Sequence, residues 1–167
     1  MAVSTAVKVR RDGTLVLEDG TGSPVQLTIA YEDGNFSANT LGPNEDRIVI
    51  RDRGTIGGLR TGDDQVGTLS FAVHFREFTN ASAGVLLDFI NATSGGSALN
   101  TVGGGGFEQF LCKITFTTEG TDNGDAADGQ AIFNSVLLTA DFSEGDPDVL
   151  NIQGEVYGAI TYTGIPA

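Results

Sequence analysis

A two-residue alternation within residues 48–78 is the feature that most constrains what this chain can fold into. The segment begins with a short charged strand, continues through a polar loop with five glycines, and ends in a long strand. In that strand Leu69, Phe71, Val73 and Phe75 fall on one face, and small or polar residues fall on the other. Successive side chains of a strand point to opposite sides, so one side is buried and the other is solvated. The pattern predicts an antiparallel sheet with a polar surface.

The rest of the chain is predicted to consist mainly of further strands. They are predicted at residues 7–10, 14–18, 25–32, 36–41, 107–118, 131–142 and 149–163. Residues 7–18 contain an Asp-Gly turn that predicts an opening hairpin. Gly154 and Gly158 interrupt the last strand and indicate a bulge or a close backbone approach. Apolar residues at helical spacing predict one amphipathic helix over residues 82–92.

These elements predict a mainly β protein, an antiparallel β-sandwich or split barrel with one α-helix packed on a sheet. The 24 glycines are far more than an average chain contains and fit tight turns between many strands. No fixed-period repeat and no linker divides the 167 residues. We therefore expect a single domain over residues 1–167.

The charge of the chain is acidic and unevenly distributed. Acidic residues outnumber basic ones 22 to 9, and residues 78–167 contain a single base, Lys113. Tight binding of DNA or RNA depends on cationic side chains that neutralise phosphates. The composition therefore disfavours a nucleic-acid-binding protein, although an acidic surface can repel nucleic acid.

Catalytic chemistry has little support in the sequence. His74 is the only histidine and lies on the polar face of its strand, and the single cysteine, Cys112, is predicted to be a small buried hydrophobe. The pair Asp63-Asp64 lies on an exposed loop, where a carboxyl group does not acquire the raised pKa of a general acid. We expect no catalytic residues and no enzymatic activity.

Ligand-binding motifs are also incomplete. In the acidic segment that starts at Asp122, Gly124, Ala126 and Phe133 occupy positions where a calcium-binding EF-hand loop needs oxygen ligands. Residues 103–106 are glycines without the Lys-Ser/Thr of a phosphate-binding loop, and the chain has no Trp on which a sugar would stack. We expect no metal site and no cofactor. We also expect no membrane association, because no long apolar run or secretory signal is visible.

The order of elements resembles that of the bacteriophage major tail tube proteins, whose relatives include ring proteins of contractile tails and type VI secretion machines. The segment IRDRGTIGGLRTGDDQVGTLSF carries the resemblance most sharply. The resemblance implies hexameric rings that stack into a hollow tube through which genome DNA passes. It implies partners among other tail proteins (tape measure, sheath or terminator, and baseplate). The location implied is the virion tail, assembled in the cytoplasm of the host bacterium.

Two sets of residues are the candidates for these roles. Mixed charges on the loop favour contacts between subunits or rings by Arg51, Asp52, Arg53, Arg60, Asp63 and Asp64. The candidates for lining the lumen lie on polar strand faces and are Gln26, Thr28, Glu32, Ser70, His74, Gln153 and Glu155. An alternative function is a non-catalytic carbohydrate- or calcium-binding β-sandwich module.

Overall fold

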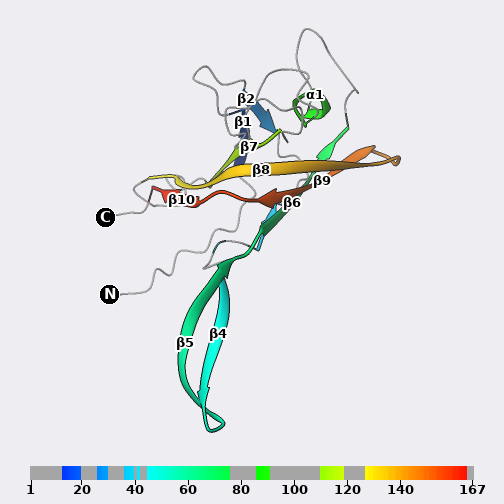
Figure 1. The fold of residues 1–167 in the computed structure, drawn as a ribbon. Coiled ribbons are helices and arrows are strands. Elements are labelled where there is room, and N and C mark those ends of the chain that lie inside the picture. The colour runs from blue at the N-terminus through cyan, green and yellow to red at the C-terminus, as the bar shows by residue number, and fades with distance from the viewer. Residues whose placement is uncertain are drawn as a thin grey trace, which may run out of the picture.

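A computed structural model describes residues 13–19, 26–29, 36–39, 41, 45–75, 86–90, 110–118 and 127–164. These residues form antiparallel strands and a short helix (Figure 1), which confirms the mainly β fold. The elements are β1 Thr14–Glu18, β2 Gln26–Ile29, β3 Ser37–Ala38, β4 Glu45–Asp52, β5 Thr55–Asp64, β6 Gly67–His74, α1 Leu86–Ile90, β7 Cys112–Thr118, β8 Gly129–Ser143, β9 Val149–Val156 and β10 Ile160–Thr163.

The larger sheet has eight strands in the order β2-β1-β7-β8-β9-β6-β3, and β10 pairs with β8 beside β9. The long strand β8 pairs with β7 along residues 129–136. Its residues 130–133 pair with β10, and residues 136–143 pair with β9. One long strand thus connects both halves of the sheet.

The strand predicted over residues 149–163 forms β9 and β10, which run in the same direction along β8, and the interruption predicted at Gly158 lies between them. The backbone N–H groups of Tyr157 and Gly158 donate to the carbonyl oxygens of Ser135 and Asn134, both at 3.0 Å. A Cβ on Gly158 would lie 2.5 Å from the Asn134 carbonyl oxygen, so only glycine allows this approach. Ser135 has a positive φ of 54°, which marks the corresponding irregularity in β8.

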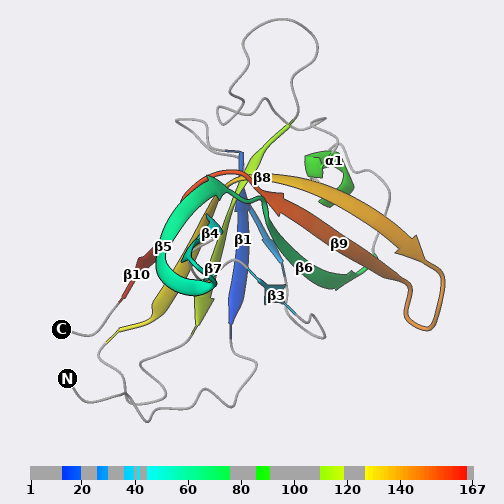
Figure 2. The same ribbon diagram turned by 60° about the horizontal axis from the view of Figure 1, so that its bottom comes forward.

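The sheet curls around one apolar core. Leu69 and Phe71 are buried and Val73 and Phe75 pack against the core, which confirms the predicted apolar face of β6. Phe36, just before β3, stacks on Phe116 of β7 with ring centroids 4.8 Å apart, although three strands separate β3 from β7 in the sheet order. The β3 end of the sheet therefore folds back across the core onto its middle strands, as in a split barrel (Figure 2).

Helix α1 covers part of this core. Leu86 is buried in it, and Leu87 and Ile90 pack against it. The structure describes α1 over Leu86–Ile90. The other residues of the predicted range 82–92 lie outside the described ones. The first strand of the predicted opening hairpin and residues 94–106 also lie outside them. Most of the acidic segment 119–130, predicted to be a loop, lies outside them too, but Gly129 and Gln130 are described and begin β8.

The prediction of a polar loop after the charged strand was wrong, because these residues form the turn and the second strand of a β-hairpin. Strands β4 and β5 pair from Glu45 and Asp64 to Asp52 and Thr55. Arg53 and Gly54 form the turn with φ values of 48° and 88°, the backbone that a two-residue type I′ turn requires. Arg-Gly is not the usual Asn-Gly or Asp-Gly of such turns, and the glycines made the strand β5 look like a loop.

Substitution of Gly154 by Val should destabilise the fold. A Cβ at this position would lie 2.7 Å from Leu69 Cδ1 and 3.0 Å from Val136 Cγ1. Overpacking of this kind costs about 1–3 kcal/mol, and we expect a lower Tm in thermal unfolding. The control Asn151→Val, at an exposed position of the same strand, should change stability by less than about 0.5 kcal/mol. An unchanged Tm for Gly154→Val would contradict this packing.

The Cys112 thiol should react slowly in the folded protein. The side chain is 1% exposed, and burial raises its pKa from the ordinary value of 9.0 to about 12. We expect labelling by an aromatic disulfide at pH 8 to be much slower in the native than in the denatured protein, because the thiolate is the nucleophile. The raised pKa also stabilises the fold below pH 9, and this contribution is lost as pH rises from 9 towards 12. Fast native labelling would contradict this burial, and the loss at high pH should be absent in Cys112→Ala.

Candidate functional site

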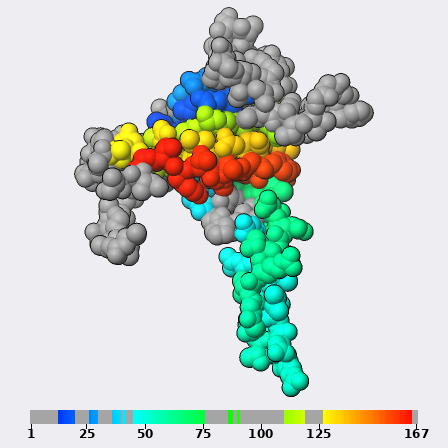
Figure 3. Space-filling model, turned by 60° about the vertical axis from the view of Figure 1, so that its left-hand side comes forward, coloured from blue at the N-terminus to red at the C-terminus, as the bar shows by residue number. Residues whose placement is uncertain are grey.

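The β4–β5 hairpin is the most distinctive surface of the molecule. It forms a separate two-stranded sheet and projects from the body of the protein (Figure 3). The ten residues of β5 span about 33 Å at the usual rise per residue. The hairpin therefore reaches well beyond the surface of the larger sheet.

Both faces of this hairpin carry apolar side chains. Val49 lies opposite Leu59, and Ile48 and Ile50 lie opposite Arg60 and Gly58 on the other face. The exposed fractions of Ile48, Val49, Ile50, Ile56 and Leu59 are between 41% and 65%. An isolated two-stranded hairpin is marginally stable in water, and a group of exposed large apolar side chains indicates an interaction surface. The hairpin has the properties of a segment that packs against a partner.

All six residues predicted to make contacts between subunits lie on this hairpin and are exposed. The structure spreads them along its length. Arg51, Asp52 and Arg53 lie near the tip, and Arg60 lies halfway along the hairpin opposite Ile48, whereas Asp63 and Asp64 lie near the base beside Glu45. The ion pair found among the described residues joins Lys113 to Glu18 (2.6 Å) on the larger sheet. Within the described part of the chain, the guanidinium groups of the hairpin arginines have no such partner.

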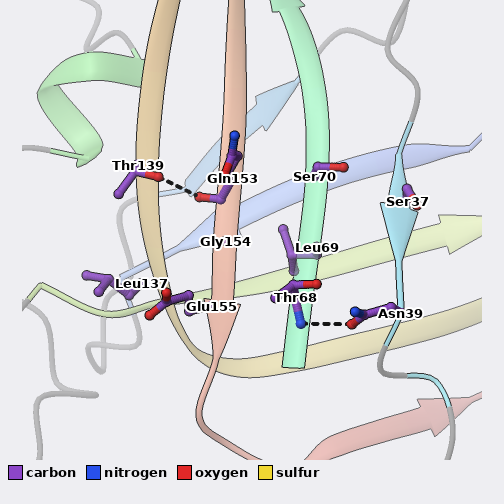
Figure 4. Close-up of a pocket in the computed structure, with 10 residues that line it drawn as sticks. All are labelled: Ser37, Asn39, Thr68, Leu69, Ser70, Leu137, Thr139, Gln153, Gly154 and Glu155. Atoms are coloured by element: carbon purple, nitrogen blue, oxygen red, sulfur yellow. Dashed lines mark hydrogen bonds between the residues drawn. The ribbon is translucent and has the colours of Figure 1, made fainter. Parts of the chain in front are cut away.

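A polar surface covers the other side of β6, β9 and β8, away from the core. Ser37, Ser70, Gln153 and Thr139 lie side by side in one row across four strands, and Glu155 lies in the next row. These residues line a shallow cavity of about 600 Å³ together with Asn39, Thr68 and Leu137 (Figure 4). Asn39 fixes its rim by accepting a hydrogen bond of 2.9 Å from the backbone N–H of Thr68.

The structure brings together only some of the predicted lumen residues. Ser70, Gln153 and Glu155 line this one cavity, and His74 lies farther along β6, half-buried. Gln26 and Thr28 are exposed on β2, at the opposite end of the sheet order, and Glu32 lies outside the described residues. Reasoning from single strands did not identify the neighbours Ser37, Thr68 and Thr139, because their alignment depends on the register between strands.

The electrostatic character of the cavity is mildly acidic. No Lys, Arg or His is among the residues that line it, and Glu155 is its charged group. The hydroxyl of Tyr157 donates a hydrogen bond to the Glu155 carboxylate, which raises the pKa of Tyr157. This surface offers hydroxyl and amide groups but no cation that would hold a phosphate.

Among the described residues, no group of three or more His, Cys, Asp or Glu side chains is arranged to hold a metal ion. None of the helices within these residues is long and apolar enough to cross a membrane. The acidic segment considered for calcium binding begins outside the described residues. The features that stand out among the described residues are the projecting hairpin and the polar face of β6, β9 and β8.

The sequence matches no family model, and no curated protein is significantly similar to it. The fold, in contrast, is similar to those of several solved structures. A chain in the extended sheath/tube terminator of the extracellular contractile injection system PVC has a TM-score of 0.58 at 15% identity, covering 98% of this chain and 100% of that one. A chain in the tube-terminating cap of the anti-feeding prophage has a TM-score of 0.56 at 15% identity, covering 99% and 95%. One in the extended PVC sheath-tube complex has a TM-score of 0.54 at 14% identity, covering 98% and 95%. The chain therefore shares its fold with components of contractile injection systems.

Proposed function

We propose that this protein is a non-enzymatic structural subunit of a phage tail or tail-like tube. Residues 1–167 act as one domain that assembles into hexameric rings, and the rings stack. The observation that carries this proposal is the β4–β5 hairpin, which exposes five large apolar side chains and unpaired arginines beyond the body of the protein. The fold supports it, because the similar chains come from a tube terminator, a tube cap and a sheath-tube complex.

Ring formation would use the edges of the larger sheet. Strands β2 and β3 end the described sheet order. An unpaired edge is a risk of aggregation in a monomer, but a closed ring of copies covers every such edge. The hairpin would then make the contacts between rings, with Arg51, Asp52 and Arg53 at its tip, Arg60 halfway along it, and Asp63 and Asp64 at its base.

The polar face of β6, β9 and β8 is the proposed wall of the lumen. The predicted lumen residues on this face are Ser70, Gln153 and Glu155. Thr139 and Ser37 extend the row of Ser70 and Gln153. A conduit for genome DNA has to avoid cationic contacts that would hold phosphates, and the residues that line this cavity include none. In this proposal DNA passes without specific binding. The further partners are the tape measure, sheath or terminator, and baseplate proteins, and the location is the tail of a particle assembled in the host bacterium.

Electron microscopy of the purified protein, with sedimentation of the same sample, tests this function. We expect the wild type to form hollow rings or tubes. The variant Ile56→Ser/Leu59→Ser should lose stacking, because it removes apolar contact area from the hairpin, and should keep its Tm, because both side chains are more than half exposed.

The matched control is Leu41→Ser, which removes an equally exposed apolar side chain away from the hairpin and should assemble like the wild type. A wild-type protein that stays monomeric at every concentration tested would overturn the proposed function. Stacking by Ile56→Ser/Leu59→Ser at the wild-type level would show that the hairpin is not the joint.

A further inference from the structure

The turn between β8 and β9 is acidic, whereas the tip of the β4–β5 hairpin carries more basic than acidic side chains. Residues 141–148 contain the carboxylates of Asp141, Glu144, Asp146 and Asp148 and no Lys or Arg. The turn is held in place, because the backbone N–H of Gly145 donates to Asp148 Oδ1 (2.8 Å) and that of Phe75 donates to the Asp148 carbonyl oxygen (2.9 Å). Asp141, Glu144 and Asp146 are exposed. The turn therefore presents three carboxylates to solvent on a fixed backbone.

An apolar surface lies beside these carboxylates. Phe142 is 48% exposed, and its ring meets the edge of Phe75 with centroids 5.0 Å apart. The hairpin tip also combines apolar and charged side chains, but its charge is net positive, since Ile50 and Ile56 lie beside Arg51, Asp52 and Arg53, and Arg60 follows farther along the same hairpin. Each surface combines an apolar centre with a charged border, and the two borders attract each other.

The two surfaces of one molecule lie apart. The β4–β5 hairpin projects from the sheet across the direction of β8 and β9, and the β8–β9 turn lies at the far end of those strands (Figures 1 and 2). They can therefore pair between copies of the chain. A contact between two different patches of identical subunits builds an open stack or filament when its rotation does not close into a ring.

We propose that the β4–β5 hairpin tip of one subunit docks on the β8–β9 turn of a subunit in the adjacent ring. Arg51 and Arg53 at the tip, with Arg60 farther along the hairpin, face Asp141, Glu144 and Asp146, and Ile50 and Ile56 cover the exposed ring of Phe142. This inference rests on the proposed function, because it names the surface that receives the hairpin. The charges favour this occupant: four of the five Lys and Arg side chains among the described residues belong to the hairpin, and the fifth, Lys113, is paired with Glu18.

Charge reversal on each side, separately and together, tests the docking. Arg53→Glu/Arg60→Glu and Asp141→Lys/Glu144→Lys should each reduce the stacked fraction in sedimentation about tenfold or more. The second variant leaves Asp148 and the Asp146-Pro147 turn intact. A chain with all four substitutions should stack again, and a 1:1 mixture of the two reversed proteins should co-assemble although neither stacks alone. Thr161→Lys, which adds a positive charge at an exposed position away from the turn, should stack like the wild type.

Stacking of the wild type should weaken as salt is raised, because exposed charge pairs are screened. Circular dichroism confirms that each variant is folded. If Asp141→Lys/Glu144→Lys does not fold, Asp141→Asn/Glu144→Gln takes its place, and its stacking should depend less on salt than that of the wild type.

The outcomes separate the two proposals. A wild-type protein that forms no rings or stacks overturns the proposed function and the docking with it. A wild type that stacks, together with a folded Asp141→Lys/Glu144→Lys that stacks equally well, overturns the docking alone. Loss of binding to a purified sheath protein by that variant, without loss of stacking, also overturns it and assigns the turn to that partner. Failure of the four-substitution chain to stack, when both reversed proteins are folded, overturns it as well.

Discussion

The pairing of β8 with three other strands is the interaction on which the rest of the structure depends. Its fifteen residues pair with β7, β9 and β10, and its side chains Phe133, Val136 and Leu138 are buried in the core. On one side of β8, β9 pairs in turn with β6, and on the other side β7 pairs with β1. Both halves of the sheet are therefore positioned through β8. Strand β5 leads into β6 after two residues, so the β4–β5 hairpin is joined to the larger sheet at the strand that pairs with β9.

The division of apolar residues between core and hairpin is compatible with a chain that folds alone and also assembles as proposed. The core is closed by contacts such as Phe36 on Phe116 and does not include residues of β4 or β5. The exposed apolar side chains of the hairpin therefore contribute little to the stability of the single chain. In the proposed assembly, a second subunit would supply the packing that a two-stranded sheet lacks by itself.

The sequence predicted the fold class and the buried face of β6 because alternation is a local signal, readable from residues such as Leu69 and Phe71. It did not predict the hairpin, because Arg53-Gly54 is an unusual pair for a type I′ turn and Gly57, Gly58 and Gly62 look like loop residues. The six charged residues proposed as contacts are all on that hairpin, but their positions along it depend on the register. The row of Ser37, Ser70, Gln153 and Thr139 also depends on strand order, which joins residues more than one hundred positions apart.

The distribution of charge constrains how copies of this chain can meet. An excess of acidic residues makes two such proteins repel one another over most relative orientations. Among the described residues the unpaired cations are concentrated on the hairpin, so within this part of the chain the attraction between copies favours orientations in which the hairpin meets a carboxylate surface. In the proposed assembly the acidic excess would disfavour incorrect contacts as well as favour the correct one. The same excess accompanies a polar face of β6, β9 and β8 without a cation among its lining residues, so one compositional bias would serve both the proposed directional assembly and a surface that does not retain a polyanion.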